Sequence, residues 1–162
     1  MTPPSRYAVR TATAADGPVV RALREGWDRE ERIGAPVDEG FADRFAAWWQ
    51  RQAGTRHTWL AWAGEQPVGM AAVVRFERMP APGQPDQAWG YISQVWVEPA
   101  WRRHGVATAL LGAAISWAQA QQFVRLVVNP SEAAARVYAA AGFRSAAELM
   151  LLELPTGPTS SG

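Results

Sequence analysis

Residues 91–111 of the chain, Y-I-S-Q-V-W-V-E-P-A-W-R-R-H-G-V-A-T-A-L-L, decide the fold. The first part, Tyr91–Val97, is rich in aromatic and β-branched residues, which is typical of a strand. Glu98-Pro99 ends that strand, because proline has no N–H to donate to a neighbouring strand. Residues 102–107 are then expected to turn into a helix that continues to about Ala120.

The turn into this helix has the composition of an anion site. The first N–H groups of a helix have no partners within it, and the helix dipole places a partial positive charge there. Gly105 has no Cβ, so an anion can approach the backbone closely. Arg102 and Arg103 add positive charge and forked hydrogen-bond donors. The turn is therefore predicted to bind a diphosphate.

Hydrophobic periodicity and turn residues predict the elements on either side of this stretch. The predicted strands are Tyr7–Thr11, His57–Ala63, Val68–Arg78, Ala88–Val97, Phe123–Val128 and Ala146–Leu154, and the predicted helices are Asp16–Arg32, Asp38–Gln52, Arg102–Ala120 and a last one from Asn129-Pro130-Ser131 to about Ala141. Thr13 is the expected N-cap of the first helix, with Asp16 three residues on. The order β-α-α-β-β-β-α-β-α-β predicts an α/β protein with a mixed sheet. Its hairpins lie early and its parallel step falls across the helix 102–120.

Length and composition limit the classes of protein that remain. With 162 residues, a single domain over residues 1–154 is expected, followed by a Pro/Gly/Ser tail, residues 155–162, that is expected to be disordered. Cysteine and lysine are both absent, which excludes disulfides, thiolate zinc sites, a phosphate-loop lysine and a Schiff-base lysine. Two separated histidines do not make a metal site. The net charge of +1, the lack of a long apolar run and the N-terminus without an apolar signal core favour a cytoplasmic protein.

Three motifs resemble the GNAT family of acyl-CoA N-acyltransferases, whose element order also agrees. The first is R-x-x-G-x-A, at Arg102, Gly105 and Ala107. The second is V-W-V-E-P, which begins at Val95, and the third is A-A-A-R-V-Y-A-A-A-G-F, residues 133–143. The similarity is clear over roughly residues 90–144, whereas the first 55 residues agree in element order and little else.

The resemblance implies a role for each motif. In the family, the first motif holds the pyrophosphate of coenzyme A, and the strand before it pairs with the pantetheine arm. A backbone N–H near Val95 would polarise the thioester carbonyl, and Tyr138 would lie near the coenzyme sulfur as the catalytic residue. The resemblance therefore implies coenzyme contacts at Val95, Trp96, Val97, Arg102, Arg103, His104, Gly105, Val106, Ala107, Thr108, Asn129 and Ser131.

The sequence departs from the family pattern at two functional positions. Many members have an asparagine seven residues before the tyrosine, where this chain has Ser131, with Asn129 two residues earlier. Many members also have a glutamate base early in the central strand. Here the nearest residues, Tyr91, Ser93 and Gln94, are poor bases, so no general base is identified. Seven acids between residues 21 and 44 fit either a cationic amine acceptor or a solvated helix face.

The function that the resemblance implies is an N-acetyltransferase. The acetyl group of acetyl-CoA would pass directly to a primary amine of a small molecule or peptide, without a metal, and a homodimer is plausible for the family. The alternative is a non-catalytic acyl-CoA-binding module on the same fold. Nucleic-acid binding is disfavoured, because fifteen acids accompany the sixteen scattered arginines. A nucleotide phosphate loop is disfavoured by the missing lysine.

Overall fold

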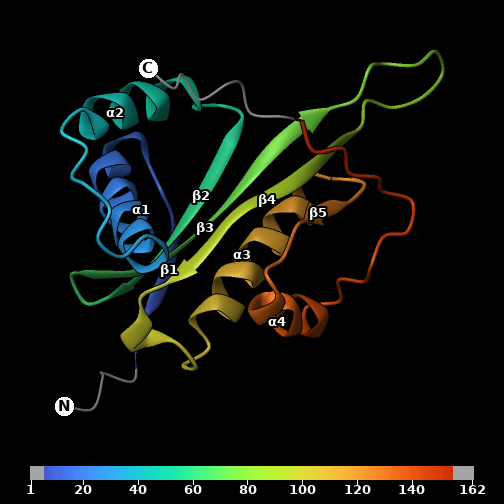
Figure 1. Cartoon of the computed structure of the whole chain (residues 1–162). Helices are drawn as coiled ribbons and strands as arrows, with labels where there is room; N and C mark the ends of the chain where they lie inside the picture. Colours follow the sequence, from blue (N-terminus) through green and yellow to red (C-terminus); the bar gives the residue numbers. More distant parts are fainter. Residues whose placement is uncertain (1–5, 155–162) are drawn as a thin grey trace.

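The computed structural model describes residues 6–154 and contains one five-stranded mixed sheet (Figure 1). Its strands lie in chain order: β1 Ala8–Thr11, β2 Arg56–Ala63, β3 Gln66–Glu77, β4 Ala88–Val97 and β5 Leu126–Val128. Neighbours from β1 to β4 are antiparallel, and β5 is parallel to β4. The predicted early hairpins and late parallel step are confirmed.

Helices cover both faces of the sheet. The helices α1 Gly17–Glu31 and α2 Phe41–Arg51 lie on one face, and α3 Val106–Ala120 and α4 Ala135–Ala140 lie on the other (Figure 1). Short 3-10 turns precede α1, α3 and α4, at Ala14–Asp16 (η1), Pro99–Trp101 (η2) and Glu132–Ala134 (η3). Each face has its own apolar core, with Leu23, Phe45 and Met70 under α1 and α2 and Val73, Leu110 and Leu111 under α3.

The start of α1 is held by one buried carboxylate. Asp16 accepts hydrogen bonds from the backbone N–H and hydroxyl of Thr13, at 2.6 and 3.0 Å. It also accepts two from Arg10 on β1, at 2.9 and 2.8 Å. The predicted N-cap pair is thus present, and the ion pair with Arg10 attaches the start of the helix to the edge of the sheet.

A β-bulge in β4 opens the sheet on its β5 side. The register between β3 and β4 steps from Ala72 opposite Gln94 to Val73 opposite Ile92, so Ser93 is an extra residue in β4. Beside β5, the pairing of β4 runs only through Gly90–Ile92. Past the bulge, no strand of the described chain lies beside that edge of β4, so its backbone groups, apart from Val97 O, which accepts from Arg102 Nε, are free to pair with a ligand.

The prediction of a last strand at Ala146–Leu154 was wrong. The chain forms no strand there, and the side chains of Met150 and Leu151 are 99% and 82% exposed. Apolar runs favour a strand locally, but a strand forms only beside a partner, and β5 is shorter than the predicted Phe123–Val128 and offers three residues. The predicted disordered tail, residues 155–162, lies outside the described residues.

Candidate active site

A cavity of about 600 Å³ lies where β4 leaves β5, between β4, the turn before α3 and the segment that contains α4. We call it the β4 cavity. Of the residues that the sequence and the resemblance single out, it brings together Val95, Trp96, Val97, Arg102, Arg103, Gly105, Val106, Ala107, Thr108, Ser131 and Tyr138. The predicted site residues, from Val95 to Tyr138, therefore share one cavity although they come from separate elements. His104 and Asn129 do not line it.

The turn before α3 presents free backbone donors to the β4 cavity. Arg103 and Gly105 adopt left-handed conformations, with φ of 64° and 80°. The first backbone hydrogen bond of the helix runs from Ala109 N–H to Gly105 O, at 3.0 Å. The N–H groups of residues 106–108 come before this bond, and within residues 6–154 no hydrogen bond from them is present. These donors and the helix dipole suit an anion.

Gly105 is required at its position for two reasons. Its φ of 80° is rarely adopted by residues that carry a Cβ. A Cβ added there would also lie 3.2 Å from the hydroxyl oxygen of Tyr7, just ahead of β1. A side chain at this position would thus strain the turn and crowd the Tyr7 hydroxyl, so that the turn or that side chain would have to move.

Arg102 forms an ion pair with a carboxylate of the same chain. Its Nη1 and Nη2 atoms each donate to Glu30 of α1 at 2.6 Å, and its Nε donates to Val97 O at 3.0 Å. Trp96 Nε1 donates to the same carboxylate at 3.0 Å. Arg102 holds the pKa of Glu30 down at about 2, with Trp96 as the next cause. The neighbouring Arg103 is exposed and lines the β4 cavity.

Tyr138 is a buried residue of α4 on the wall of the β4 cavity. The residue is 7% exposed, and its ring packs edge-on against Phe143 with a centroid separation of 5.5 Å. Burial, and next the nearby Tyr91, raises the pKa of Tyr138 above its ordinary value. Its hydroxyl makes no hydrogen bond within the described part of the chain. The phenol is therefore protonated at neutral pH and can donate a proton into the cavity.

The two predicted contacts outside the cavity and Ser131 have local roles in the backbone. His104 Nδ1 lies 2.7 Å from Arg102 O, within the turn. Asn129 directly follows β5 and does not face the cavity. The hydroxyl of Ser131 accepts from Ala134 N–H at 3.3 Å, so it caps η3, and it also lines the β4 cavity.

The bulge residues Ser93 and Gln94 accept hydrogen bonds from within the chain, and neither side chain is a base. Ser93 Oγ and Gln94 Oε1 both accept from Arg56 Nη1 of β2, at 2.5 and 2.7 Å. Glu98, the carboxylate at the end of β4, does not line the β4 cavity. Within residues 6–154, no group of three or more His, Cys, Asp or Glu side chains is placed to hold a metal ion. No helix there is long and apolar enough to cross a bilayer.

Sequence reasoning missed the contribution of α1 to the site. Trp27, Glu30 and Glu31 line the β4 cavity, as do Trp101 and Val137. Glu30 was one of seven acids in a charged segment, and nothing in the sequence marks it out from the others. Its role depends on Arg102, 72 positions further along the chain, and only the fold brings the two together.

A sequence profile described as the acetyltransferase (GNAT) family matches residues 20–143. The chain belongs to this family. Its model covers both the α1–α2 segment, where the sequence resemblance was weak, and the motifs of β4, α3 and α4. Membership confirms the recognised family and the GNAT-like fold. No curated protein matches the chain.

Solved structures share the fold of this GNAT chain at low identity. A predicted acetyltransferase from Clostridium acetobutylicum, crystallised with acetyl-CoA, has 21% identity and a TM-score of 0.75, covering 91% of this chain and 96% of that one. An aminoglycoside acetyltransferase from an uncultured soil metagenomic sample, in complex with sisomicin, has 15% identity and a TM-score of 0.73, with coverages of 94% and 97%. A GCN5-related N-acetyltransferase from Ralstonia eutropha has 22% identity and a TM-score of 0.68, with coverages of 91% and 99%.

Proposed function

We propose that this GNAT protein transfers the acetyl group of acetyl-CoA to a primary amine by direct attack. The observation that carries the proposal is the β4 cavity. It combines an unpaired strand edge, a turn of free N–H donors and a protonated tyrosine. The family and the acetyl-CoA complex of the Clostridium acetobutylicum relative support the choice of acyl donor. We take the acceptor to be a small molecule or a peptide, and a cytoplasmic location and a homodimer remain predictions.

The parts of the cavity suit successive parts of the coenzyme. The N–H groups at the start of α3 and the exposed Arg103 would hold the pyrophosphate, because both offer positive charge without an acidic partner there. The free edge of β4, past Ser93, would pair with the amides of the pantetheine arm as a further strand would. Arg102 would orient this site through Glu30 and Val97 O, and a direct phosphate contact from Arg102 stays a prediction.

Two groups of the chain would act at the reacting thioester. The backbone N–H of Val95, on the open edge, would donate to the carbonyl oxygen as negative charge develops there. Tyr138 would donate its proton to the leaving thiolate. A thiol has a reference pKa of about 8.5 and a tyrosine of about 10, so at these values the transfer has a modest cost, and the raised pKa of Tyr138 adds to that cost. No side chain is assigned as base, and the proposal requires that the amine reaches the cavity in its neutral form.

The competing proposal is a GNAT domain that binds acyl-CoA without turnover. The observation that favours it is the expected base position itself, where the hydroxyl of Ser93 and the amide of Gln94 are not basic and both accept hydrogen bonds from Arg56. The two proposals differ in turnover but agree in coenzyme binding.

Calorimetric titration with acetyl-CoA, with adenosine and free pantetheine as controls, is the first test. Micromolar binding of the intact coenzyme is expected, followed by release of free thiol in a panel of primary amines. Binding without thiol release across the panel would favour the non-catalytic module. No binding at millimolar acetyl-CoA would overturn both proposals.

A further inference from the structure

A second, smaller cavity lies on the opposite face of the sheet, beneath α1 and α2. It has a volume of about 40 Å³, which is room for a group of a few heavy atoms. We call it the Arg56 cavity, after the β2 residue on its wall. Its polar lining consists of Arg24 from α1, Arg56 and Thr58 from β2, and Gln94 from the bulge of β4. The lining contains two cations and no acid.

Arg56 is a half-buried cation with neutral partners. Its Nη1 donates to Ser93 and Gln94, its Nε donates to Gln52 Oε1 at 3.4 Å, and its guanidinium lies 4.9 Å from the ring centroid of Trp48. Among the described residues, no carboxylate lies within ion-pair distance, and Nη2 has no hydrogen-bond acceptor. Burial lowers the pKa of Arg56, because its charge is not compensated. Burying a cation without an anion costs free energy, so this arrangement suits a negatively charged ligand.

Arg24 and Thr58 add unused donors to the same cavity. Arg24 Nη2 forms a long ion pair with Asp28, at 3.9 Å, and the same carboxylate accepts two shorter hydrogen bonds from Arg32, at 2.9 and 2.6 Å. In the described chain, Arg24 Nη1 and Thr58 Oγ1 are buried atoms without a hydrogen-bond partner. Thr58 is only 4% exposed. Buried donors without an acceptor are rare in native proteins, so we expect a bound ligand to accept hydrogen bonds from these two groups.

We propose that the amine substrate carries a carboxylate, which occupies the Arg56 cavity. This inference rests on the proposed acetyl transfer and names the class of its acceptor. An ionised carboxylate only accepts hydrogen bonds, and its two oxygens match Arg56 Nη2, Arg24 Nη1 and the hydroxyl of Thr58. Gln94 on the cavity wall directly precedes Val95, whose N–H is proposed to face the thioester. A short amino acid would place its two ends on either side of the β4 bulge.

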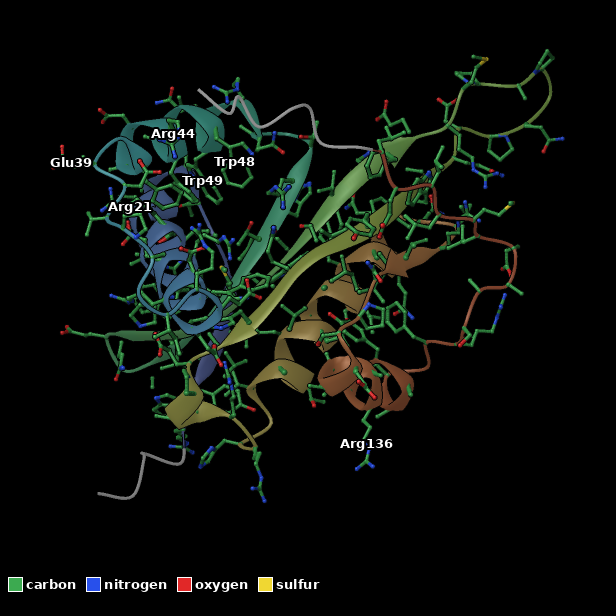
Figure 2. The ribbon with its side chains drawn as sticks, viewed as in Figure 1. Arg21, Glu39, Arg44, Trp48, Trp49 and Arg136 are labelled. Atoms are coloured by element: carbon green, nitrogen blue, oxygen red, sulfur yellow. The ribbon has the colours of Figure 1, made fainter. Side chains whose placement is uncertain are left out.

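The acids of the α1–α2 segment do not argue for a polycationic acceptor instead. Four of the seven pair with arginines: Glu25 with Arg21, Asp28 with Arg32, Glu30 with Arg102 and Asp38 with Arg44. Trp27 Nε1 donates to Glu31, a fifth acid, at 2.6 Å. Figure 2 shows Arg44, Trp48 and Trp49 together on α2, beside the labelled Arg21. Most of the negative charge there is neutralised within the chain, whereas the charge of Arg56 is not.

The test is a comparison of short amino acids with their amides. Glycine, β-alanine and γ-aminobutyrate are each paired with the corresponding amide, and thiol release is followed at saturating acetyl-CoA. At one chain length or more, kcat/KM is expected to be at least tenfold higher for the acid, as one charge-assisted hydrogen bond is worth about that factor. Arg56→Gln is expected to raise the KM of the acid about tenfold more than the KM of the amide, because losing the hydrogen bonds to Ser93 and Gln94 would affect both substrates alike.

Two further variants separate recognition from folding. Arg56 also holds the β4 bulge, so Arg24→Gln, which leaves those hydrogen bonds intact, is expected to raise the KM of the acid alone. Arg136→Gln is the matched control, because Arg136 points away from α4 into solvent (Figure 2) and should change neither KM. Binding of each acid and amide to the acetyl-CoA-saturated protein is measured by calorimetry, so the result does not depend on turnover.

The outcomes distinguish this inference from the proposed function. If acetyl-CoA binds but each amide binds and reacts as well as its acid, the carboxylate inference is wrong and acetyl transfer stands. Equal loss of acid and amide binding in Arg24→Gln and Arg56→Gln would also overturn it. Failure to bind acetyl-CoA at all would overturn the proposed function.

Discussion

Among the described residues, Glu30 makes the side-chain hydrogen bonds that span the largest separation in sequence, 72 positions to Arg102. Its carboxylate joins α1 to Arg102 in the turn before α3 and to Trp96 on β4, so one side chain fixes both walls of the β4 cavity mouth. These contacts depend on charge, because Arg102 favours the ionised carboxylate. The pKa of Glu30 is therefore lowered from 4.5 to about 2.

The pH dependence of stability tests this contact. A carboxyl group with a depressed pKa in the folded state stabilises the protein above its unfolded pKa and loses that effect as pH falls through the folded pKa. We expect the difference in free energy of unfolding between wild type and Glu30→Gln to be constant above about pH 5 and to shrink steadily toward pH 2. Urea titrations of both proteins at several pH values measure it. A difference independent of pH would mean that Glu30 is not ion-paired in solution.

Asp16 is expected to contribute more to stability than an exposed acid. Asp16→Ala leaves the Thr13 N–H and the Arg10 guanidinium without their acceptor, so the free energy of unfolding should fall by roughly 2 kcal/mol. Asp28→Ala, which removes an i,i+4 pair near the surface, should cost clearly less than Asp16→Ala. Urea denaturation of the two variants is the measurement. Equal losses would contradict the role of Asp16 in anchoring α1 to β1.

Tyr138 is expected to affect turnover rather than coenzyme affinity. Tyr138→Phe removes the proposed proton donor, so kcat should fall on the order of 100-fold, while the Kd of acetyl-CoA stays within about twofold. Because burial raises the pKa of Tyr138, loss of its proton should reduce wild-type kcat only above about pH 10. Steady-state thiol release and calorimetry measure both quantities. Equal kcat for the two proteins would remove Tyr138 from the mechanism.

Among the elements, β4 could be predicted from sequence with both bounds and α3 with its end, whereas α3 begins at Val106, four residues after the predicted Arg102. The residues that mark their ends lie next to them in the sequence: Pro99 follows the strand, and Gly105 precedes a helix whose apolar residues have helical spacing. The bulge at Ser93 was not predictable, because it is a mismatch between β3 and β4 and neither strand encodes it alone. The missing strand at residues 146–154 has the same origin, since its existence depends on the length of β5.

The turn before α3 gives the sharpest test of an element. Gly105→Val is expected to abolish acetyl-CoA binding, because the left-handed turn and the contact with Tyr7 both exclude a branched side chain. Gly64→Val is the matched control. Gly64 also has a positive φ, in the β2–β3 hairpin, but open space surrounds it. Both variants should lose roughly 1–2 kcal/mol of stability, and only Gly105→Val should lose coenzyme in calorimetry. Retained binding would disprove the loop assignment.

For the molecule as a whole, the two sides of the active site differ in how far sequence predicts them. The wall made by Val95, Gly105 and Tyr138 follows from motifs in neighbouring segments and a recognised family. The Arg56 cavity combines Arg24, Arg56 and Gln94, which come from three elements without a motif. Only the fold shows that these residues share a cavity and that acids elsewhere in the chain pair with other arginines.

The exposed end of the described chain yields a prediction about association. Leu151→Ser combined with Leu152→Ser should change the free energy of unfolding by less than about 0.5 kcal/mol, because both side chains are at least 80% exposed. The same change should reduce self-association at high concentration, because it removes an exposed apolar patch. Urea denaturation and sedimentation velocity measure the two effects. A loss of more than about 1 kcal/mol would mean that this segment packs on the domain.

The single parallel strand pair also has a kinetic consequence. β2, β3 and β4 follow one another directly in the chain, so their contacts are comparatively local and can form early, whereas β5 reaches β4 only after the chain has passed through α3. The cleft between β4 and β5 should consequently be among the last parts to assemble and the first to open. A ligand held there would slow unfolding without accelerating refolding, because its contacts are absent from the transition state.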